Sequence, residues 1–355
     1  MPPADRKLPD WQRYLERPAA TGRLRATPED FQVWELPLIE PQGTGSHLWL
    51  EVRKRGANTQ WVASQLAAAA GVPERDIGFA GMKDRHAVTT QWFSVGLQHA
   101  RSVEWAGWEI PDVTLLQGHR HGRKLRRGAL RGNRFRIVLQ DLQDGGDALE
   151  SRLATLAASG VPNYFGPQRF GRDGANVRRA VQWLEKGGRI KRSHRSIYLS
   201  AVRSYLFNLL LAERVRLGNW NRLVDGDLAM LDGSHSTFAC TLPDAELVRR
   251  CAEFDIHPTG PLPGRSGRRG GSSPVGEAAS LEQAALGPHR EWVEALQRAG
   301  VDADRRSLRV VPKRLDWQLE ESRLTLAFDL PPGAYATSVL RELVLSDPDT
   351  ISEDA

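Results

Sequence analysis

Apolar and polar positions in the first third of the chain mostly alternate with the two-residue period of β-strands. The alternation covers residues 31–38 and 47–53, and in the second segment it places Leu48, Leu50 and Val52 on one face. We expect these two segments to be neighbouring strands of one sheet.

A stretch with a helical period follows. Asn58 or Thr59 is its expected cap, and Gly71, supported by Pro73, is its expected end. The apolar side of this helix is formed by Val62, Leu66 and Ala69.

Two further strands are expected at residues 77–80 and 89–95. The charged segment 82–85 therefore lies on a loop between two strands, directly after Gly81. A loop tip on a rigid sheet is a common place for catalytic residues.

A later strand is expected at residues 133–139, and its two faces differ in chemistry. One face carries Asn133, Phe135, Ile137 and Leu139. The other face carries Arg134 and Arg136.

The middle of the chain has a different pattern, which is mainly helical over residues 148–220 and again over 282–298. Between them, residues 260–278 are rich in Gly, Pro, Ser and Arg and predict a mobile loop. A strand at residues 324–328 and a helix at 335–345 end the pattern. Sheet-like ends around a helical middle predict an inserted domain, with the C-terminal strand rejoining the first sheet.

The composition of the chain is that of a soluble globular protein. Its 355 residues are enough for two domains, and 40% of them are hydrophobic and 26% charged. No apolar run approaches the roughly 18 residues of a membrane span, and the polar N-terminal segment does not have the apolar stretch of a secretory signal. We therefore expect a cytoplasmic protein that does not contact a membrane.

The positive charge of the chain is concentrated locally. The net charge is +6, and residues 119–136 contain eight lysines and arginines and no acid. A solvated basic face would give the same run, but phosphate binding is a natural use of such a cluster. Phe135 at its end could stack on a base of RNA. Further basic positions follow in the helical middle: Arg169, Arg172, Arg178, Arg179, Arg189, Lys191, Arg192 and Arg195.

Asp84 is the candidate for chemistry, because it lies between Lys83 and Arg85 on the glycine-led loop. Nearby cations favour an ionised carboxylate, which can act as a nucleophile or a base. A structural ion pair has the same local sequence, so Asp84 needs support from its context. His86 is not assigned a catalytic role.

Sites for metals and cofactors are not indicated by the sequence. Cys240 and Cys251 form no C-x-x-C pair and are expected to be buried thiols. His119 and His121 have no partners at the spacing of a zinc site. No P-loop and no G-x-G-x-x-G after a strand is present, so no nucleotide cofactor is expected, which also disfavours an RNA methyltransferase.

Long motifs along nearly the whole chain resemble those of the tRNA pseudouridine synthase D (TruD) family. In the first half these are PEDFQVWE at Pro28, GTGSHLWLEVRKRGANTQWVA at Gly43, GFAGMKDRHAVTTQWFSV at Gly78, LRRGALRGNRFRIVL at Leu125 and GVPNYFGPQRFG at Gly160. In the second half they are LSAVRSYLFNLLLAERV at Leu199, VDGD at Val224 and LPPGAYATSVLRELV at Leu330.

The resemblance implies an α/β (α+β) catalytic domain of the pseudouridine synthase type, with a mixed or antiparallel sheet. A mainly helical TruD-type insertion would interrupt it, giving a catalytic domain at residues 1–159 and 307–355 and an insertion at 160–306. The implied activity is isomerisation of uridine to pseudouridine at position 13 of tRNA, near the dihydrouridine arm, without metal or organic cofactor.

The resemblance also implies roles for individual residues. The essential aspartate of the family falls on Asp84, and its N-x-F motif falls on Asn133 and Phe135, which should approach the target base together. The basic residue before the PEDF motif, commonly lysine in the family, is Arg25 here. The planar guanidinium group of arginine is not equivalent to the ammonium group of lysine.

The basic neighbours of Asp84 are further candidates for substrate binding. Lys83 and Arg85 would point away from Asp84 on an extended loop, which favours Arg25 as the partner of that carboxylate. Attack on C1′, attack on C6 and proton abstraction from the ribose all remain open as the role of Asp84.

Two alternatives to a tRNA pseudouridine synthase remain. One is a catalytically inactive protein that binds or folds tRNA, and the other is an enzyme that modifies a different RNA. The sequence leaves open which tRNAs are used and the oligomeric state.

Overall fold

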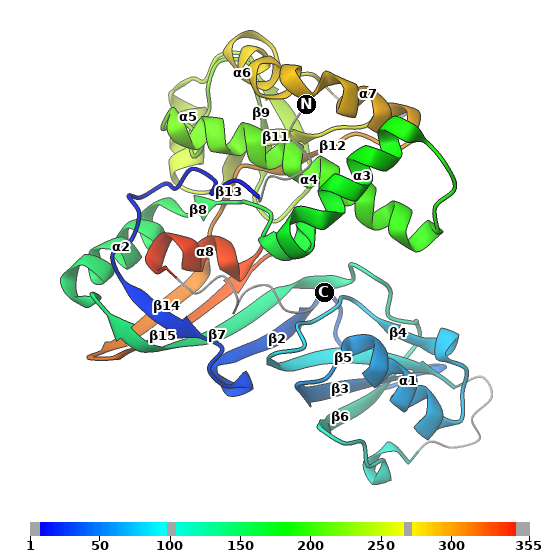
Figure 1. Cartoon of the computed structure of the whole chain (residues 1–355). Helices are drawn as coiled ribbons and strands as arrows, with labels where there is room; N and C mark the ends of the chain where they lie inside the picture. Colours follow the sequence, from blue (N-terminus) through cyan, green and yellow to red (C-terminus); the bar gives the residue numbers. More distant parts are fainter. Residues whose placement is uncertain (1–7, 98–103, 266–271, 346–355) are drawn as a thin grey trace. The chain divides into compact units, whose positions relative to one another are not determined.

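The structure, a computed structural model, describes residues 8–97, 104–265 and 272–345. Within these ranges the chain forms two compact units (Figure 1). The sheet unit comprises residues 21–146 and 313–333, and the helix-rich unit comprises 8–20, 147–312 and 334–345. Compact units and functional domains are different divisions of a chain, so the expected boundaries at 159/160 and 306/307 stay a prediction.

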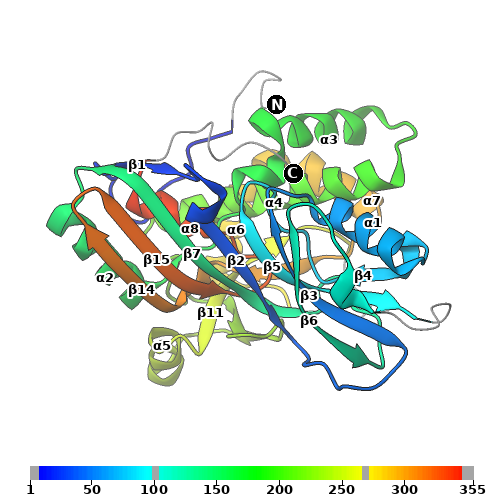
Figure 2. The ribbon, with the colours of Figure 1, turned by 90° about the horizontal axis from the view of Figure 1, so that it is seen from below.

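A large mixed sheet forms the sheet unit, as expected for the fold class. In the described part it has nine strands, in the order β14-β15-β7-β2-β5-β3-β6, with β1 on β7 and β4 on β5 (Figure 2). The pair β2–β5 is parallel and the other pairs are antiparallel. The strands are β1 (Thr21–Leu24), β2 (Phe31–Pro37), β3 (His47–Arg55), β4 (Ile77–Phe79), β5 (Val88–Gly96), β6 (Val113–His121), β7 (Leu130–Gln143), β14 (Lys313–Glu320) and β15 (Arg323–Leu330).

The C-terminal strand does rejoin the first sheet, since β15 pairs with β7 from Leu324↔Leu139 to Leu330↔Asn133. The expectation that β2 and β3 are neighbours was wrong, because β5 lies between them. Seven successive residues of β5, from Thr89 to Val95, are buried, which is typical of a central strand. Alternation within a strand does not carry information about which strands pair.

Helix α1 (Thr59–Ala70) belongs to the same unit and begins and ends as expected. The side chain of Asn58 accepts a hydrogen bond from the backbone of Gln60 at 2.7 Å, and Gly71 ends the helix with φ +65°. Ala69, however, is exposed. The buried face is formed by Val62, Ala63, Leu66 and Ala67, which pack against residues of β3 and β5.

The helix-rich unit contains α2 (Gly146–Ser159), α3 (Ala175–Lys186), α4 (Arg192–Arg216), α5 (Ala245–Ala252), α6 (Gly276–Leu286), α7 (Arg290–Arg298) and α8 (Ala336–Leu343). Its largest core packs the buried face of α4, with Val202, Leu206 and Phe207, against Phe170 and Trp292. None of the helices in the described ranges is long and apolar enough to cross a membrane.

The expectation of a mainly helical middle missed a second sheet. In the described residues it has four strands in the order β10-β9-β11-β12. They are β9 (Asp227–Leu231), β10 (Thr237–Cys240), β11 (Ile256–Leu262) and β12 (Asp304–Ser307), and a separate short pair joins β8 (Val161–Pro162) to β13 (Arg309–Val310).

The start of the expected mobile loop is also part of this sheet, since Gly260 lies within β11. Residues 266–271 of that loop lie outside the described part. Cys240 and Cys251 are free and buried, as expected.

Candidate active site

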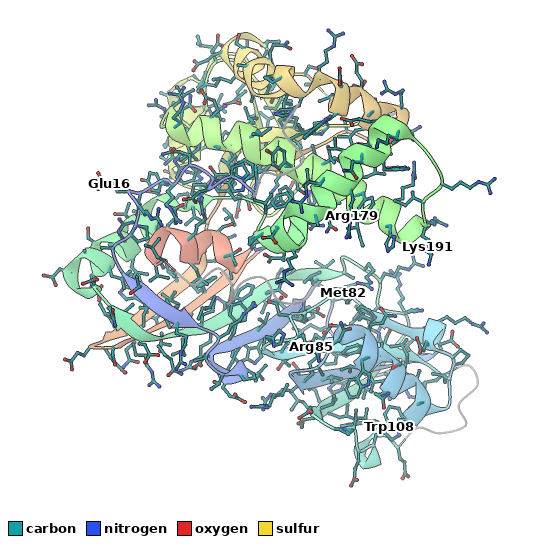
Figure 3. All side chains as sticks on the ribbon, in the orientation of Figure 1. Glu16, Met82, Arg85, Trp108, Arg179 and Lys191 are labelled. Carbon is teal, nitrogen blue, oxygen red and sulfur yellow. The ribbon has the colours of Figure 1, made fainter. Side chains whose placement is uncertain are left out.

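The loop between β4 and β5, residues 80–87, is anchored at its base (Figure 3 labels Met82 and Arg85 on it). The backbone of Lys83 donates a hydrogen bond to the hydroxyl of Thr59 at 3.0 Å, and that hydroxyl donates to Oε1 of Gln91 at 3.1 Å. Nε2 of Gln91 in turn donates to the carbonyl of Gly81 at 3.1 Å. The first turn of α1 and the central strand β5 therefore hold this loop.

Lys83 contacts Glu35 and Asn133 within the sheet unit, in agreement with the expectation that it is not the partner of Asp84. Its ammonium lies 2.8 Å from Oε2 of Glu35 and donates a hydrogen bond to Oδ1 of Asn133 at 2.7 Å. The side chains of Lys83 and Glu35 are only 5% and 1% exposed. The charge of Lys83 is thus used within the protein, where it ties the loop to β2 and β7.

Arg25 is the cation that pairs with Asp84, which confirms the pairing expected from the sequence. Its Nη2 lies 3.0 Å from Oδ2 of Asp84. The side chain of Arg25 is 14% exposed, whereas that of Asp84 is 40% exposed. The carboxylate is therefore held from the protein side and open to solvent on the other.

The backbone of Arg25 is strained, with φ +57°, a conformation that non-glycine residues rarely adopt. Such strain is often found where a side chain is held for function. Its guanidinium carbon also lies 4.2 Å from the ring centroid of Phe31, so one arginine packs on the aromatic ring and reaches Asp84.

Phe135 lies on the same face of β7 as Asn133, as expected, but it is only 7% exposed. Its ring meets Phe31 edge-on at a centroid distance of 6.2 Å and stacks on Phe328 at 5.5 Å. Phe31 thus links Phe135 to Arg25 and, through it, to Asp84. Only a small part of the Phe135 ring is available to a ligand, so stacking on a base stays a prediction.

Lys54 is a buried site residue that was not predicted from the sequence. Its side chain donates hydrogen bonds to the carbonyl oxygens of Ala57 at 2.6 Å and Asp84 at 2.8 Å, and the residue is 0% exposed. Burial lowers the pKa of Lys54 to about 8, with Asp84 opposing and Lys83 adding to the shift. A signal existed, because position 54 continues the buried face of Leu50 and Val52, where a lysine needs a buried partner.

Lys54→Met is expected to remove a pH dependence of stability. The pKa of Lys54 in the folded protein, about 8, is below its ordinary 10.5. Between these values the folded protein binds fewer protons than the unfolded chain, so the wild type gains stability as the pH rises. Relative to Lys54→Met, the free energy of unfolding of the wild type rises by at most about 3 kcal/mol over this pH range. Chemical denaturation of both proteins from pH 7.5 to 10.5 measures it, and a difference that does not change with pH would contradict a buried titrating amine.

The other candidates have varied surroundings. Arg85 is exposed on the loop. His121 is buried and stacks on Trp49 at a centroid distance of 4.0 Å, and its Nδ1 accepts a hydrogen bond from the backbone of Arg123 at 2.9 Å. Within the described ranges, no group of three or more His, Cys, Asp or Glu residues could hold a metal ion.

The basic positions of the helix-rich unit are mostly exposed. Arg169 is an exception, since it donates hydrogen bonds to the hydroxyls of Tyr335 at 2.9 Å and Ser200 at 3.0 Å. Arg179, on α3, and Lys191, just before α4, are labelled in Figure 3. The exposed members are Arg172, Arg179, Arg189, Lys191, Arg192 and Arg195.

Comparison with known proteins gives the relatives of this chain. It is 48% identical to a tRNA pseudouridine synthase D from Methylococcus capsulatus over 331 residues, covering 92% of each chain. It is 46% identical to a protein of the same name from Aeromonas salmonicida, covering 93% of this chain and 92% of the relative. A crystal structure of a Methanosarcina mazei protein with the same family description has a similar fold, with a TM-score of 0.71 and 23% identity, covering 97% of this chain and 98% of that one.

A family model described as tRNA pseudouridine synthase D (TruD) matches residues 12–188 and 173–343. The two matches span almost the whole chain, and the relatives cover more than nine tenths of it. The chain therefore belongs to the tRNA pseudouridine synthase D (TruD) family, which confirms the resemblance of its ordered motifs.

Proposed function

We propose that this protein isomerises a uridine of tRNA to pseudouridine, at position 13 near the dihydrouridine arm, with Asp84 as the essential carboxylate. The single observation that carries the proposal is the geometry of Asp84. It is 40% exposed on an anchored loop and is held by Arg25 at 3.0 Å. A carboxylate that is fixed on one side and accessible on the other is suited to meet a substrate.

The reaction needs a site that keeps a detached base in place. The bond from N1 to C1′ breaks, the uracil rotates, and C5 joins C1′ as the proton of C5 is lost and N1 gains one. No atom is added or removed, so side chains alone can carry the reaction. Asp84 can attack C1′ or C6 or take a proton from the ribose. Because a stacked uridine is inaccessible, the nucleotide is flipped out of the RNA first.

The other residues divide into those that position the loop and those that meet the RNA. Lys54 and Lys83 are buried and bonded to protein groups, so they hold the loop that carries Asp84. Arg25 orients the carboxylate directly. Asn133 accepts a hydrogen bond from Lys83, and Phe135 supports Phe31 and offers its exposed part to the base. Arg85 is exposed on the same loop, and its positive charge would attract the RNA backbone.

The proposal is tested by supplying different RNAs. Unmodified transcripts of tRNA, ribosomal RNA fragments and messenger RNA fragments are incubated with the protein, and pseudouridine is measured in each. We expect pseudouridine in the tRNA transcripts. In the cell, we expect the substrate to be the unmodified tRNA of the cytoplasm. Pseudouridine only in the ribosomal or messenger RNA fragments would show that the substrate is not tRNA. Tight tRNA binding without pseudouridine would show that the protein binds tRNA without modifying it.

Replacing Phe135 is expected to weaken catalysis more than tRNA binding. Since the residue is buried, Phe135→Ala would cost about 3–5 kcal/mol of stability and confuse the assay. Phe135→Leu keeps most of the volume but removes the aromatic ring, and we expect about a tenfold lower kcat with nearly unchanged tRNA affinity. Turnover by Phe135→Leu at the wild-type rate would show that the aromatic ring has no part in the reaction.

A further inference from the structure

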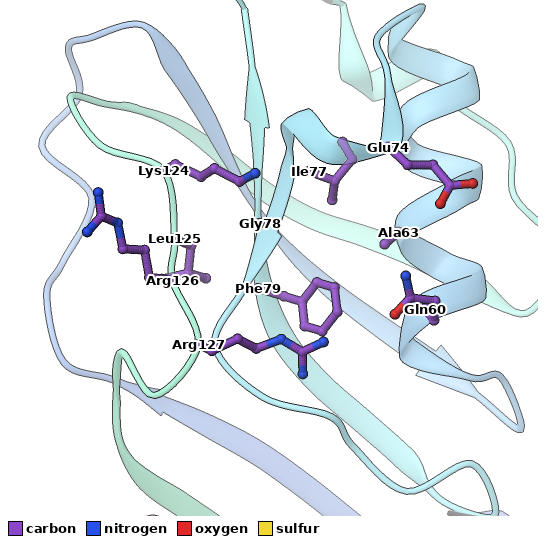
Figure 4. Close-up of a pocket in the computed structure, with 10 residues that line it drawn as sticks. All are labelled: Gln60, Ala63, Glu74, Ile77, Gly78, Phe79, Lys124, Leu125, Arg126 and Arg127. Carbon is purple, nitrogen blue, oxygen red and sulfur yellow. The ribbon is translucent and has the colours of Figure 1, made fainter. Parts of the chain in front are cut away.

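A pocket of about 440 Å³ lies in the sheet unit, beside β4 and α1 (Figure 4). Its volume is within the roughly 300–1,000 Å³ of sites for small molecules. One wall is apolar and consists of Ala63, Ile77 and Phe79. The polar groups that complete the lining are Gln60, Glu74, Lys124, Arg126 and Arg127.

The pocket belongs to the elements that hold the catalytic loop. Phe79 is the last residue of β4, and the carbonyl of the next residue, Ala80, accepts a hydrogen bond from the backbone of Gly128 at 2.8 Å. Gln60 follows Thr59, whose hydroxyl accepts from the backbone of Lys83. A ligand in this pocket would thus lie next to the base of the loop that carries Asp84.

Arg127 is the most unusual group of the lining. Its guanidinium carbon lies 4.1 Å from the ring centroid of Phe79, and partial burial lowers the pKa of Arg127. In the part of the chain that the structure describes, no hydrogen bond or ion pair to a protein group holds this guanidinium. Lys124, in contrast, donates a hydrogen bond to the carbonyl of Arg75.

The arrangement leaves one face of the guanidinium for a ligand. Phe79 covers the other face and is itself only 8% exposed. In Figure 4 the side chain of Arg127 runs along Phe79 toward Gln60. A planar cation whose N–H donors have no partner among the described residues, in one pocket with the amide of Gln60, suits a nucleobase that stacks and forms hydrogen bonds. Lys124, which also lines the pocket, adds a second positive charge that suits a phosphate.

We propose that this pocket binds a nucleotide of the RNA substrate other than the target uridine, with its base stacked on Arg127. The amide of Gln60, which lines the same pocket, would form hydrogen bonds with the edge of the base, and Lys124 would add a positive charge for the phosphate. The inference rests on the proposed function, because it takes the substrate to be RNA. It adds a second point at which the protein holds that RNA.

The test measures the binding of a fluorescein-labelled, unmodified tRNA transcript by Arg127→Ala and Arg127→Lys. Lysine keeps the positive charge but lacks the planar guanidinium on which a base can stack. Both variants should therefore bind tRNA about tenfold more weakly than the wild type. KM should rise accordingly with little change in kcat. The matched control is Arg323→Ala, since Arg323 is 51% exposed in the same unit and lies 3.9 Å from Glu320.

Three results would overturn the proposal. The first is that Arg127→Ala binds tRNA as tightly as the control variant. The second is that Arg127→Lys binds tRNA as tightly as the wild type. The third is that the Arg127 variants have a lower kcat and Tm but an unchanged KM. Failure of the proposed function would differ, because the wild type would then form no pseudouridine whatever the affinities of the Arg127 variants.

Discussion

Asp84→Asn is expected to abolish pseudouridine formation, with a loss on the order of a thousandfold or more, while tRNA affinity stays within about twofold of the wild type. The substitution keeps the size of the side chain and removes the charge that each of the three chemical routes requires. Because Asp84 is 40% exposed, its replacement leaves the core of the sheet unit intact. Single-turnover assays with excess enzyme measure the chemical step, and melting curves check the fold.

A control with the same chemistry is available in Asp141→Asn. Asp141 also pairs with an arginine, Arg23, at 3.1 Å, and its side chain is 67% exposed in the same unit. Its activity should equal that of the wild type. Equal product from Asp84→Asn and Asp141→Asn would show that Asp84 has no essential role.

Arg25→Ala is expected to lower kcat about a hundredfold with a small effect on KM, because a misplaced catalytic group loses about that factor. The variant breaks the 3.0 Å contact with Asp84 and the packing on Phe31. Arg25→Lys should have an intermediate effect, since an ammonium can reach the carboxylate but has no plane to pack on the ring.

Arg25→Gly separates the role of the side chain from its strain. Glycine adopts φ +57° freely, so this variant should be as stable as Arg25→Ala or more stable, and equally impaired in kcat. Separate measurement of kcat, KM and Tm for the three variants checks this. A variant with wild-type kcat and a lowered Tm would show that Arg25 only supports the fold.

The sequence predicted the part of the site that depends on local pattern. Asp84 was expected on a loop between strands, and the alternation of side chains along that loop predicted that Lys83 is not its partner. In the structure Lys83 contacts Glu35 instead. Asp84 pairs with Arg25, which lies 59 positions away in the sequence. The family motif made Arg25 a candidate, and the alternation along the loop favoured it over Lys83 and Arg85 as the partner.

Partners that the fold brings together were not predicted. Glu35, Lys83 and Asn133 come from β2, the loop and β7, and their contacts require the order of the strands. That order was only partly foreseen, since β5 separates β2 from β3. Lys54 could have been found by asking why a lysine continues a buried strand face.

The second sheet was missed for a different reason. Strand β11 has the sequence IHPTGPL, whose two prolines and one glycine are typical of loops. Its register still pairs it with β9 and β12, and Pro258 and Gly260 are buried. Packing in the helix-rich unit thus outweighs a local preference that argues against a strand.

Pseudouridine formation that depends on Asp84 can be measured by mapping pseudouridine in an unmodified tRNA transcript after incubation with the wild-type protein. Carbodiimide treatment followed by primer extension locates each modified position. We expect a single new pseudouridine at position 13, which is absent when Asp84→Asn is used. A transcript that the wild-type protein binds tightly but that carries no pseudouridine at any position would show that the protein is not a tRNA pseudouridine synthase.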